Sequence, residues 1–160
     1  MIKNESDMNF ILDSYSYIME DDIFYKKMSS KFGTKDVDFI IKRKNKLLFV
    51  EAKRSSPQEL KDYIAEIVVK FIDSLFIFTG IILNRKNTQS SIITQDMNKI
   101  NHLKGSIQLV LIIKNAEESH LRPISYLLQK KLRKIIKMYS LETSVIVMNE
   151  ALARNKRFIQ

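Results

Sequence analysis

Three charged residues in the segment 38–53 have the types and the spacing that hydrolysis of a phosphodiester requires. Asp38 interrupts an apolar stretch, VDFII, while Glu51 and Lys53 interrupt a second one, LLFVEAK. Two neighbouring carboxylates repel each other unless a cation neutralises them, and Mg²⁺ or Mn²⁺ commonly binds one or two carboxylates together with water and phosphate. Such a metal can polarise a phosphoryl oxygen and activate water, and a neighbouring ammonium group can position that water and stabilise the developing charge.

The alternation of side chains along a β-strand indicates that these groups can meet. Glu51 and Lys53 are two positions apart and therefore share a face, as do Asp36 and Asp38 on the preceding strand. A hairpin through the polar turn RKNK at 43–46 brings Asp38 beside Glu51. The alternative is that all three are solvated strand residues, with the Glu–Lys pair a minor stabiliser. The apolar surroundings, and the helix that follows at once, favour the site.

The elements that must position this trio alternate between helices and strands. Apolar spacing predicts helices over 6–19 with Ser6 as N-cap, from Ser56 as N-cap and Pro57 to Phe78, and over 95–103, 122–139 and 149–156. Alternating or continuous apolar runs predict strands over 37–42, 47–53, 107–113 and 143–148. The stretch 23–28 fits a short strand or a helical turn, and 31–36, around Gly33, is a predicted turn.

This order of elements predicts an α/β protein with a mixed central β-sheet flanked by helices on both faces. The chain has 160 residues without a linker or repeat, so residues 1–160 are expected to form a single domain. The apolar stretch 64–83 approaches the length of a membrane span, but Glu66, Lys70 and Asp73 lie inside it. It is therefore predicted to be a buried helix, and no membrane partner is expected.

The composition narrows the class of protein. The chain contains no Cys, which excludes a disulfide scaffold, a thiolate zinc site and a Cys nucleophile, and fits a cytoplasmic location. Its start shows no signal peptide. With 27 Lys and Arg against 18 Asp and Glu, the net charge is +9. A basic surface favours a polyanionic partner such as nucleic acid, although a compositional excess of Lys would give the same charge.

One predicted helix carries a candidate nucleic-acid-binding face. At 100° per residue, its four cationic positions share one side and its Leu and Ile residues the other. These cations are Lys130, Arg133, Lys134 and Lys137. They could follow a phosphate backbone, or they could be the solvated side of an ordinary amphipathic helix. The two histidines, His102 and His120, have no zinc-site spacing and are given no role.

VDFII and LLFVEAK followed by a helix resemble the core of the PD-(D/E)XK nuclease superfamily, the restriction-endonuclease-like fold. Asp38 matches the Asp of that motif and Glu51, Ala52 and Lys53 match (D/E)XK, whereas Val37 stands in place of Pro. The resemblance covers at most residues 6–113. It implies an αβββαβ core, here with a C-terminal α-β-α extension, and dependence on Mg²⁺ or Mn²⁺. It also implies that the main-chain carbonyl of Ala52 helps Asp38 and Glu51 to bind the metal.

The resemblance also suggests auxiliary residues. Members of the superfamily often add a Glu from the first helix, for which Glu20 is the best-placed candidate and Glu5 the second. Some members place a Gln at the start of the helix after the motif, where this chain has Gln58. Alternatively, Glu20 belongs to an acidic helix end, and Gln58 is ordinary first-turn polarity.

The sequence therefore predicts a metal-dependent nuclease, with DNA favoured over RNA as the substrate. Asp38 and Glu51 would hold the metal, and Lys53 would position the attacking water. Whether one copy or a homodimer cuts is left open. The alternatives are a non-catalytic nucleic-acid-binding domain and a protein-interaction domain on the same fold.

Overall fold

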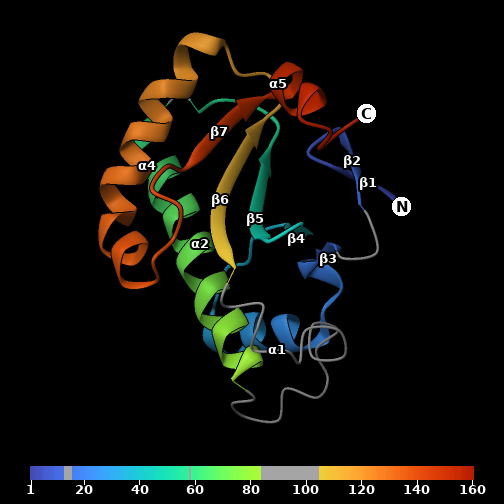
Figure 1. The fold of residues 1–160 in the computed structure, drawn as a ribbon, viewed down its shortest axis with the longest axis vertical. Helices are drawn as coiled ribbons and strands as arrows, with labels where there is room; N and C mark the ends of the chain where they lie inside the picture. The colour runs from blue at the N-terminus through green and yellow to red at the C-terminus, as the bar shows by residue number, and fades with distance from the viewer. Residues whose placement is uncertain (13–15, 58, 84–104) are drawn as a thin grey trace.

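A five-stranded mixed sheet forms the centre of the molecule (Figure 1). The computed structural model describes residues 1–12, 16–57, 59–83 and 105–160. The strand order is β3-β4-β5-β6-β7, antiparallel from β3 to β5 and parallel from β5 to β7. The strands of this sheet are β3 (Ser16–Ile18), β4 (Phe39–Arg43), β5 (Lys46–Lys53), β6 (Ser106–Ile113) and β7 (Ile146–Asn149).

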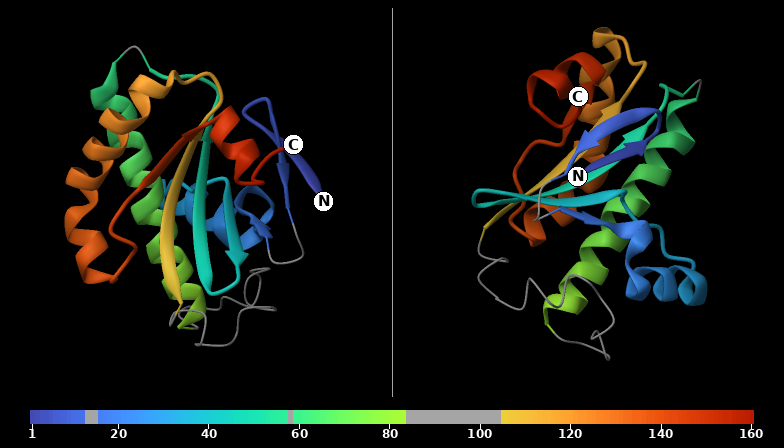
Figure 2. Two further views of the ribbon diagram at one scale, coloured as in Figure 1. Left: turned by 45° about the horizontal axis from the view of Figure 1, so that its top comes forward. Right: turned by 90° about the vertical axis from the view of Figure 1, so that its right-hand side faces the viewer.

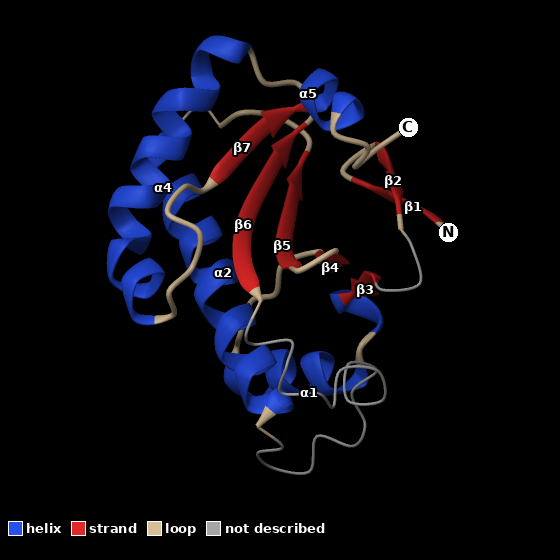
Figure 3. Ribbon diagram, viewed as in Figure 1, coloured by secondary structure: helices blue, strands red, loops and turns tan. Residues whose placement is uncertain are grey.

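Helices cover one face of this sheet, and the two ends of the chain cover most of the other (Figures 2 and 3). On the first face lie α1 (Ile23–Phe32), α2 (Leu60–Ile82) and α4 (Glu118–Met138). On the second lie the two-stranded sheet of β1 (Ile2–Glu5) and β2 (Met8–Ile11), the short helix α5 (Glu150–Asn155) and the segment around Phe158. The short 3-10 helix η1 (Met19–Asp21) joins β3 to α1. The α/β prediction is thus confirmed.

Strand β5 is buried on both faces, as its apolar run predicts. Leu47 and Phe49 pack in the cluster beneath α2 and α4, whereas Leu48 and Val50 pack in the cluster beneath the β1–β2 hairpin. Strand β6 is parallel to β5 in full register, from the pair Lys46–Ser106 to the pair Lys53–Ile113. The long helix α2 makes the crossover that a parallel pair requires. It therefore starts beside the end of β5 that carries Glu51 and Lys53.

The predicted helix over 6–19 is wrong. Residues 2–11 form the β1–β2 hairpin, and Ser6 and Asp7, with φ of 51° and 59°, make its two-residue turn. Met8, Phe10 and Leu12 are buried and alternate with exposed residues, which is the period of a strand. The apolar positions of this short segment fit both periods, and packing on the open face of the main sheet decides between them.

The predicted start of the long helix is also wrong, because α2 begins at Leu60 with Glu59 as N-cap and without a side-chain cap bond. The backbone carbonyl of Arg54 accepts a hydrogen bond from the backbone N–H of Asn115 (3.2 Å), and residues 54 and 55 form a bend before the helix. At its other end α2 continues past Gly80 to Ile82. Burial of the last apolar side chains outweighs the roughly 1 kcal/mol cost of a helical glycine.

The remaining elements agree with their predictions to within a few residues. Strands β4, β5 and β6 and helix α5 lie as predicted, α4 begins one turn early at Glu118, and β7 begins late at Ile146. The ambiguous stretch 23–28 is part of α1, which Gly33 ends with φ 65°. The predicted helix over 95–103 lies outside the described residues.

Replacing the cap of α1 should weaken the fold measurably. The carboxylate of Asp22 is buried and accepts hydrogen bonds from the backbone N–H groups of Phe24 (2.9 Å) and Tyr25 (3.0 Å). Asp22→Ala should lower the free energy of unfolding by about 1–2 kcal/mol, measured by urea denaturation. The exposed neighbour Asp21, changed to Ala, should cost less than about 0.5 kcal/mol. Equal unfolding midpoints for the two variants would show that the cap contributes nothing.

Candidate functional site

The hairpin of β4 and β5 brings Asp38 close to Glu51. Phe39 pairs with Val50 where β4 begins, and Asp38 directly precedes this pair. Glu51 follows Phe49 on the face of β5 that α2 covers. Asp38 lies outside β4, and both Val37 and Ile40 pack in the cluster beneath α2, so strand alternation does not assign its face. The charge of Glu51 contributes to the raised pKa of Asp38, as expected for two neighbouring carboxylates.

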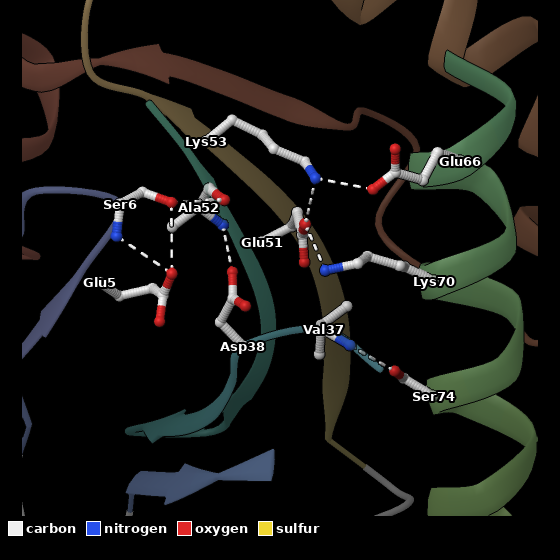
Figure 4. Close-up of polar contacts among 10 residues, drawn as sticks. All are labelled: Glu5, Ser6, Val37, Asp38, Glu51, Ala52, Lys53, Glu66, Lys70 and Ser74. Carbon is white, nitrogen blue, oxygen red and sulfur yellow. Dashed lines mark hydrogen bonds and ion pairs between the residues drawn. The ribbon is translucent and has the colours of Figure 1, made fainter. Parts of the chain in front are cut away.

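The main chain of Ala52 lies at the open edge of β5, where β4 has not yet begun (Figure 4). Its N–H donates to Asp38 Oδ2 at 2.7 Å. Its carbonyl oxygen accepts a hydrogen bond from Ser6 Oγ at 3.2 Å, and Ser6 Oγ also lies 3.3 Å from Glu5 Oε1. The tip of the β1–β2 hairpin therefore reaches the same edge as Asp38, and it adds the carboxylate of Glu5 to the site.

Two lysines approach the carboxylate of Glu51 from different elements (Figure 4). Lys70 of α2 lies 2.7 Å from Glu51 Oε1, and Lys53 of β5 lies 3.3 Å from the same oxygen. Lys53 also donates to Glu66 Oε1 at 2.8 Å. Glu66 and Lys70 are four residues apart on α2, so one face of the helix supplies both contacts. The result is a continuous chain of ion pairs from Lys70 through Glu51 and Lys53 to Glu66.

Burial raises the pKa values of Asp38 and Glu51. Burial, and then the charge of Glu51, raise the pKa of Asp38 to about 8, against the opposing effects of Lys70 and of the Ala52 N–H. Burial also raises the pKa of Glu51, although Lys70 and Lys53 oppose it. Burial lowers the pKa of Lys53, but the bond to Glu66 and the charge of Glu51 outweigh it, and the net shift is upward. Burial thus disfavours the charged form of both carboxylates, and Lys53 stays protonated.

Helix α2 also holds the segment that leads into Asp38. Asp73 Oδ2 accepts from the backbone N–H of Lys35, and the fully buried Ser74 Oγ accepts from the backbone N–H of Val37, both at 2.9 Å. A cavity of about 270 Å³ opens beside this segment, and its lining includes Glu5, Glu20, Lys35, Asp36, Asp38 and Lys70. The site is thus accessible from the side of Asp38.

The donor atoms at this edge fit a hard divalent cation. Glu51 Oε2 is buried and has no hydrogen-bond partner among the described residues, and Asp38 and the Ala52 carbonyl lie at the same edge. Two carboxylates and one carbonyl, completed by water and phosphate, are a common ligand set for Mg²⁺. Within the described ranges, no three His, Cys, Asp or Glu side chains gather as a cation site by themselves. Water and substrate would therefore supply the remaining ligands.

The structure gives the two predicted auxiliary Glu residues different contacts. Glu20 lies in η1, mostly exposed, and forms an ion pair with Lys3. Glu5 is nearer to the motif, because it shares Ser6 Oγ with the Ala52 carbonyl and its charge raises the pKa of Asp38. The second-choice candidate thus has the closer contacts, and it comes from a strand and not from a helix. Gln58 lies outside the described residues.

The basic face of α4 lies away from the trio. Lys130, Arg133, Lys134 and Lys137 are all exposed and occupy the second half of the helix. Just beyond this half, the backbone N–H of Glu142 donates to the carbonyl of Ile107, where β6 begins. Glu51 and Lys53 lie at the opposite end of the parallel strands. The face is available to a polyanion, but it does not border the site.

Sequence reasoning missed three residues of α2 that surround Glu51. It used Glu66 and Lys70 only as charges that argue against a membrane span, and it did not consider Tyr63. The Tyr63 hydroxyl is buried without a hydrogen-bond partner among the described residues, and burial, then the charges of Glu51 and Glu66, raise its pKa. The i, i+4 spacing of Glu66 and Lys70 was visible in the sequence. Which side of α2 faces the end of β5 is a property of the packing.

The fold and the site define an α/β protein with a five-stranded mixed sheet and a buried acidic centre at the end of β5. Comparisons with protein-family models, curated proteins and solved structures found no match to this chain. In the part of the chain that the structure describes, no helix combines the length and apolar character that crossing a membrane requires.

Proposed function

We propose that this protein is a metal-dependent nuclease of the PD-(D/E)XK type that hydrolyses phosphodiester bonds, with DNA favoured over RNA. The observation that carries the proposal is that Asp38 accepts from the Ala52 N–H, directly beside a fully buried Glu51 whose carboxylate lies 3.3 Å from Lys53. Burying a carboxylate lowers the stability of the fold, and carboxylates with raised pKa values cluster at functional sites. The net charge of +9 supports a polyanionic substrate.

Each residue would have a distinct role. Asp38, Glu51 and the Ala52 carbonyl would hold Mg²⁺ or Mn²⁺, which when bound supplies a Lewis acid beside the scissile phosphate. The protonated Lys53 would orient the attacking water and stabilise negative charge on the phosphate. Glu66, at 2.8 Å from Lys53, would keep that ammonium in place. Glu5 would extend the acidic edge on the side of the cavity.

A non-catalytic nucleic-acid-binding domain is the second candidate, and one observation favours it. Lys70 and Lys53 already neutralise the charge of Glu51 without any metal, as a purely structural ion-pair network would. In that case the basic surface would bind nucleic acid in a salt-sensitive way, and the acidic residues would affect only stability.

Cleavage assays with matched Glu→Gln variants separate the two candidates. Linear, branched and single-stranded DNA and RNA would be incubated with Mg²⁺, Mn²⁺ or EDTA. The wild type should cut at least one substrate only with metal, and Glu51→Gln should cut it at least about 100-fold more slowly. Glu142→Gln is the control, because Glu142 forms an ion pair with Lys46 at the other end of β5. It should cut like the wild type.

Asp38→Asn provides a second test. Unlike Glu51→Gln, it does not place a neutral amide beside the ammonium groups of Lys53 and Lys70. Its side-chain oxygen can still accept from the Ala52 N–H, so the fold should persist while the charge is lost. Circular dichroism would confirm folding in each variant. Full activity of both Glu51→Gln and Asp38→Asn would exclude the nuclease proposal, and metal-independent, salt-sensitive binding without cleavage would support the second candidate.

A further inference from the structure

Lys70 is the principal counter-ion of the buried Glu51. Its Nζ lies 2.7 Å from Glu51 Oε1, closer than the 3.3 Å of Lys53 (Figure 4). The ammonium of Lys53 is shared with Glu66, whereas the ion pair of Lys70 in the described part of the chain is with Glu51 alone. Only 18% of the Lys70 side chain is exposed, so solvent screens this pair weakly. Removing Lys70 would therefore leave Glu51 with only the more distant ammonium of Lys53, which is shared with Glu66.

An ammonium group and a divalent cation compete for this carboxylate. Both bind carboxylate oxygens, and two cations a few ångströms apart in a poorly solvated site repel each other strongly. Glu51 Oε2 is buried without a hydrogen-bond partner among the described residues, so a metal bound there would share one carboxylate with Lys70. Lys53 can keep its ion pair with Glu66 when the metal binds. Among the described residues, Lys70 has no second ion-pair partner at its present position.

Asp36 offers Lys70 another partner nearby. Lys70 and Asp36 line the same cavity, and Asp36 Oδ1 is buried without a hydrogen-bond partner among the described residues. Burial raises the pKa of Asp36 to about 6, while the charge of Lys70 lowers it, so the two groups already interact. The lysine stem is long and flexible enough to turn its ammonium from one carboxylate to another.

We propose that Lys70 is a built-in counter-ion that holds Glu51 in the metal-free protein and turns to Asp36 when a divalent metal binds. This inference rests on the proposed metal site at Asp38 and Glu51. The exchange leaves both Glu51 and Lys70 with a partner of opposite charge in each state. It also makes the metal displace an ammonium group, so the site fills only at metal concentrations that overcome the ion pair.

Calorimetric titration with MnCl₂ tests the competition. Lys70→Met should bind Mn²⁺ at least about tenfold more tightly than the wild type, because the metal no longer displaces a cation. Lys70→Arg keeps the charge and should stay near the wild-type affinity. Lys35→Met is the matched control, since Lys35 lines the same cavity but is exposed and is not paired with Glu51. It measures the general effect of removing one positive charge, expected to be within about threefold.

A double-mutant cycle tests the part assigned to Asp36. Asp36→Asn should weaken Mn²⁺ binding when Lys70 is present, because the displaced ammonium then has no carboxylate to pair with. In the Lys70→Met background the same change should have no effect. An equal loss in both backgrounds would mean that Asp36 acts on the metal directly, which would overturn its role as the second partner of Lys70.

The wild-type protein gives an answer even if Lys70→Met does not fold. NMR of the lysine ammonium groups, with Lys70 assigned through Lys70→Arg, should show its signal shifting as MgCl₂ is added. An unchanged Lys70 signal at saturating metal, or equal Mn²⁺ affinity of Lys70→Met and the wild type, overturns the exchange while leaving the metal site intact. Absence of metal binding from every variant would overturn the metal site itself. Metal binding without cleavage would overturn only the nuclease activity.

Discussion

A Lys53→Met variant should keep its fold and bind the metal at least as tightly as the wild type, but cut nucleic acid roughly 10²- to 10⁴-fold more slowly. Lys53 touches Glu51 and Glu66 but supplies no ligand atom, so its loss removes a positioned cation and not the metal site. Met keeps much of the length of the stem, which limits the loss of packing. Glu51 retains its closer partner Lys70 in this variant. The cleavage rate at saturating substrate is the deciding measurement.

Lys46→Met is a closely matched control for this variant. Lys46 begins β5 as Lys53 ends it, and its Nζ lies 2.9 Å from Glu142, much as Lys53 lies 2.8 Å from Glu66. Both changes therefore remove one positive charge from the same strand, although Lys46→Met removes one ion pair and Lys53→Met removes two. Equal rates for Lys53→Met and the wild type would show that Lys53 has no part in the chemistry. Equal losses in both variants would show that the effect is general electrostatics.

Local sequence signals were sufficient to predict the hairpin of β4 and β5 that carries the site. The apolar runs of β4 and β5 are separated by a short polar turn, and in such a case strand alternation and antiparallel pairing follow from adjacent residues alone. The proximity of Asp38 to the Glu51–Ala52 end of β5 follows from that local pairing. The crossover helix and the parallel strand β6 were also predictable, because a strand buried on both faces has a continuous apolar run.

The surroundings of Glu51 depend on contacts that are distant in sequence and could not be predicted in this way. Glu5 approaches the site because an N-terminal hairpin, whose short apolar pattern also fits a helix, packs on the second face of the sheet. Lys70 contacts Glu51 because of the rotation of α2 about its axis, which is determined by how Ile67 and Phe71 pack in the core. Side-chain periodicity defines an apolar stripe, but it does not say which flank of that stripe faces a given strand end.

The stability of the metal-free protein should fall as pH rises from about 6 to 8, and Asp38→Asn should remove most of this slope. The pKa of Asp38 is about 8 in the folded protein, whereas an Asp in an unfolded chain has a pKa of about 3.9. Between these values the folded state binds a proton that the unfolded state has released. Stability therefore decreases with rising pH, by up to about 1.4 kcal/mol per pH unit, and levels off above pH 8.

The range from pH 6 to 8 separates Asp38 from its neighbour Asp36, whose folded pKa of about 6 confines its contribution to lower pH. Urea unfolding in EDTA at half-unit pH steps would measure the slope. Asp38→Asn stays neutral and can still accept from the Ala52 N–H, so it should be nearly flat over this range and more stable than the wild type at pH 8. The exposed Asp62, changed to Asn, should keep the wild-type slope. A wild-type slope in Asp38→Asn would mean that another group takes up the proton.

Because a divalent metal replaces that proton at the proposed site, Mg²⁺ should restore the stability of the wild type at pH 8. It should not raise the stability of Asp38→Asn to the same extent.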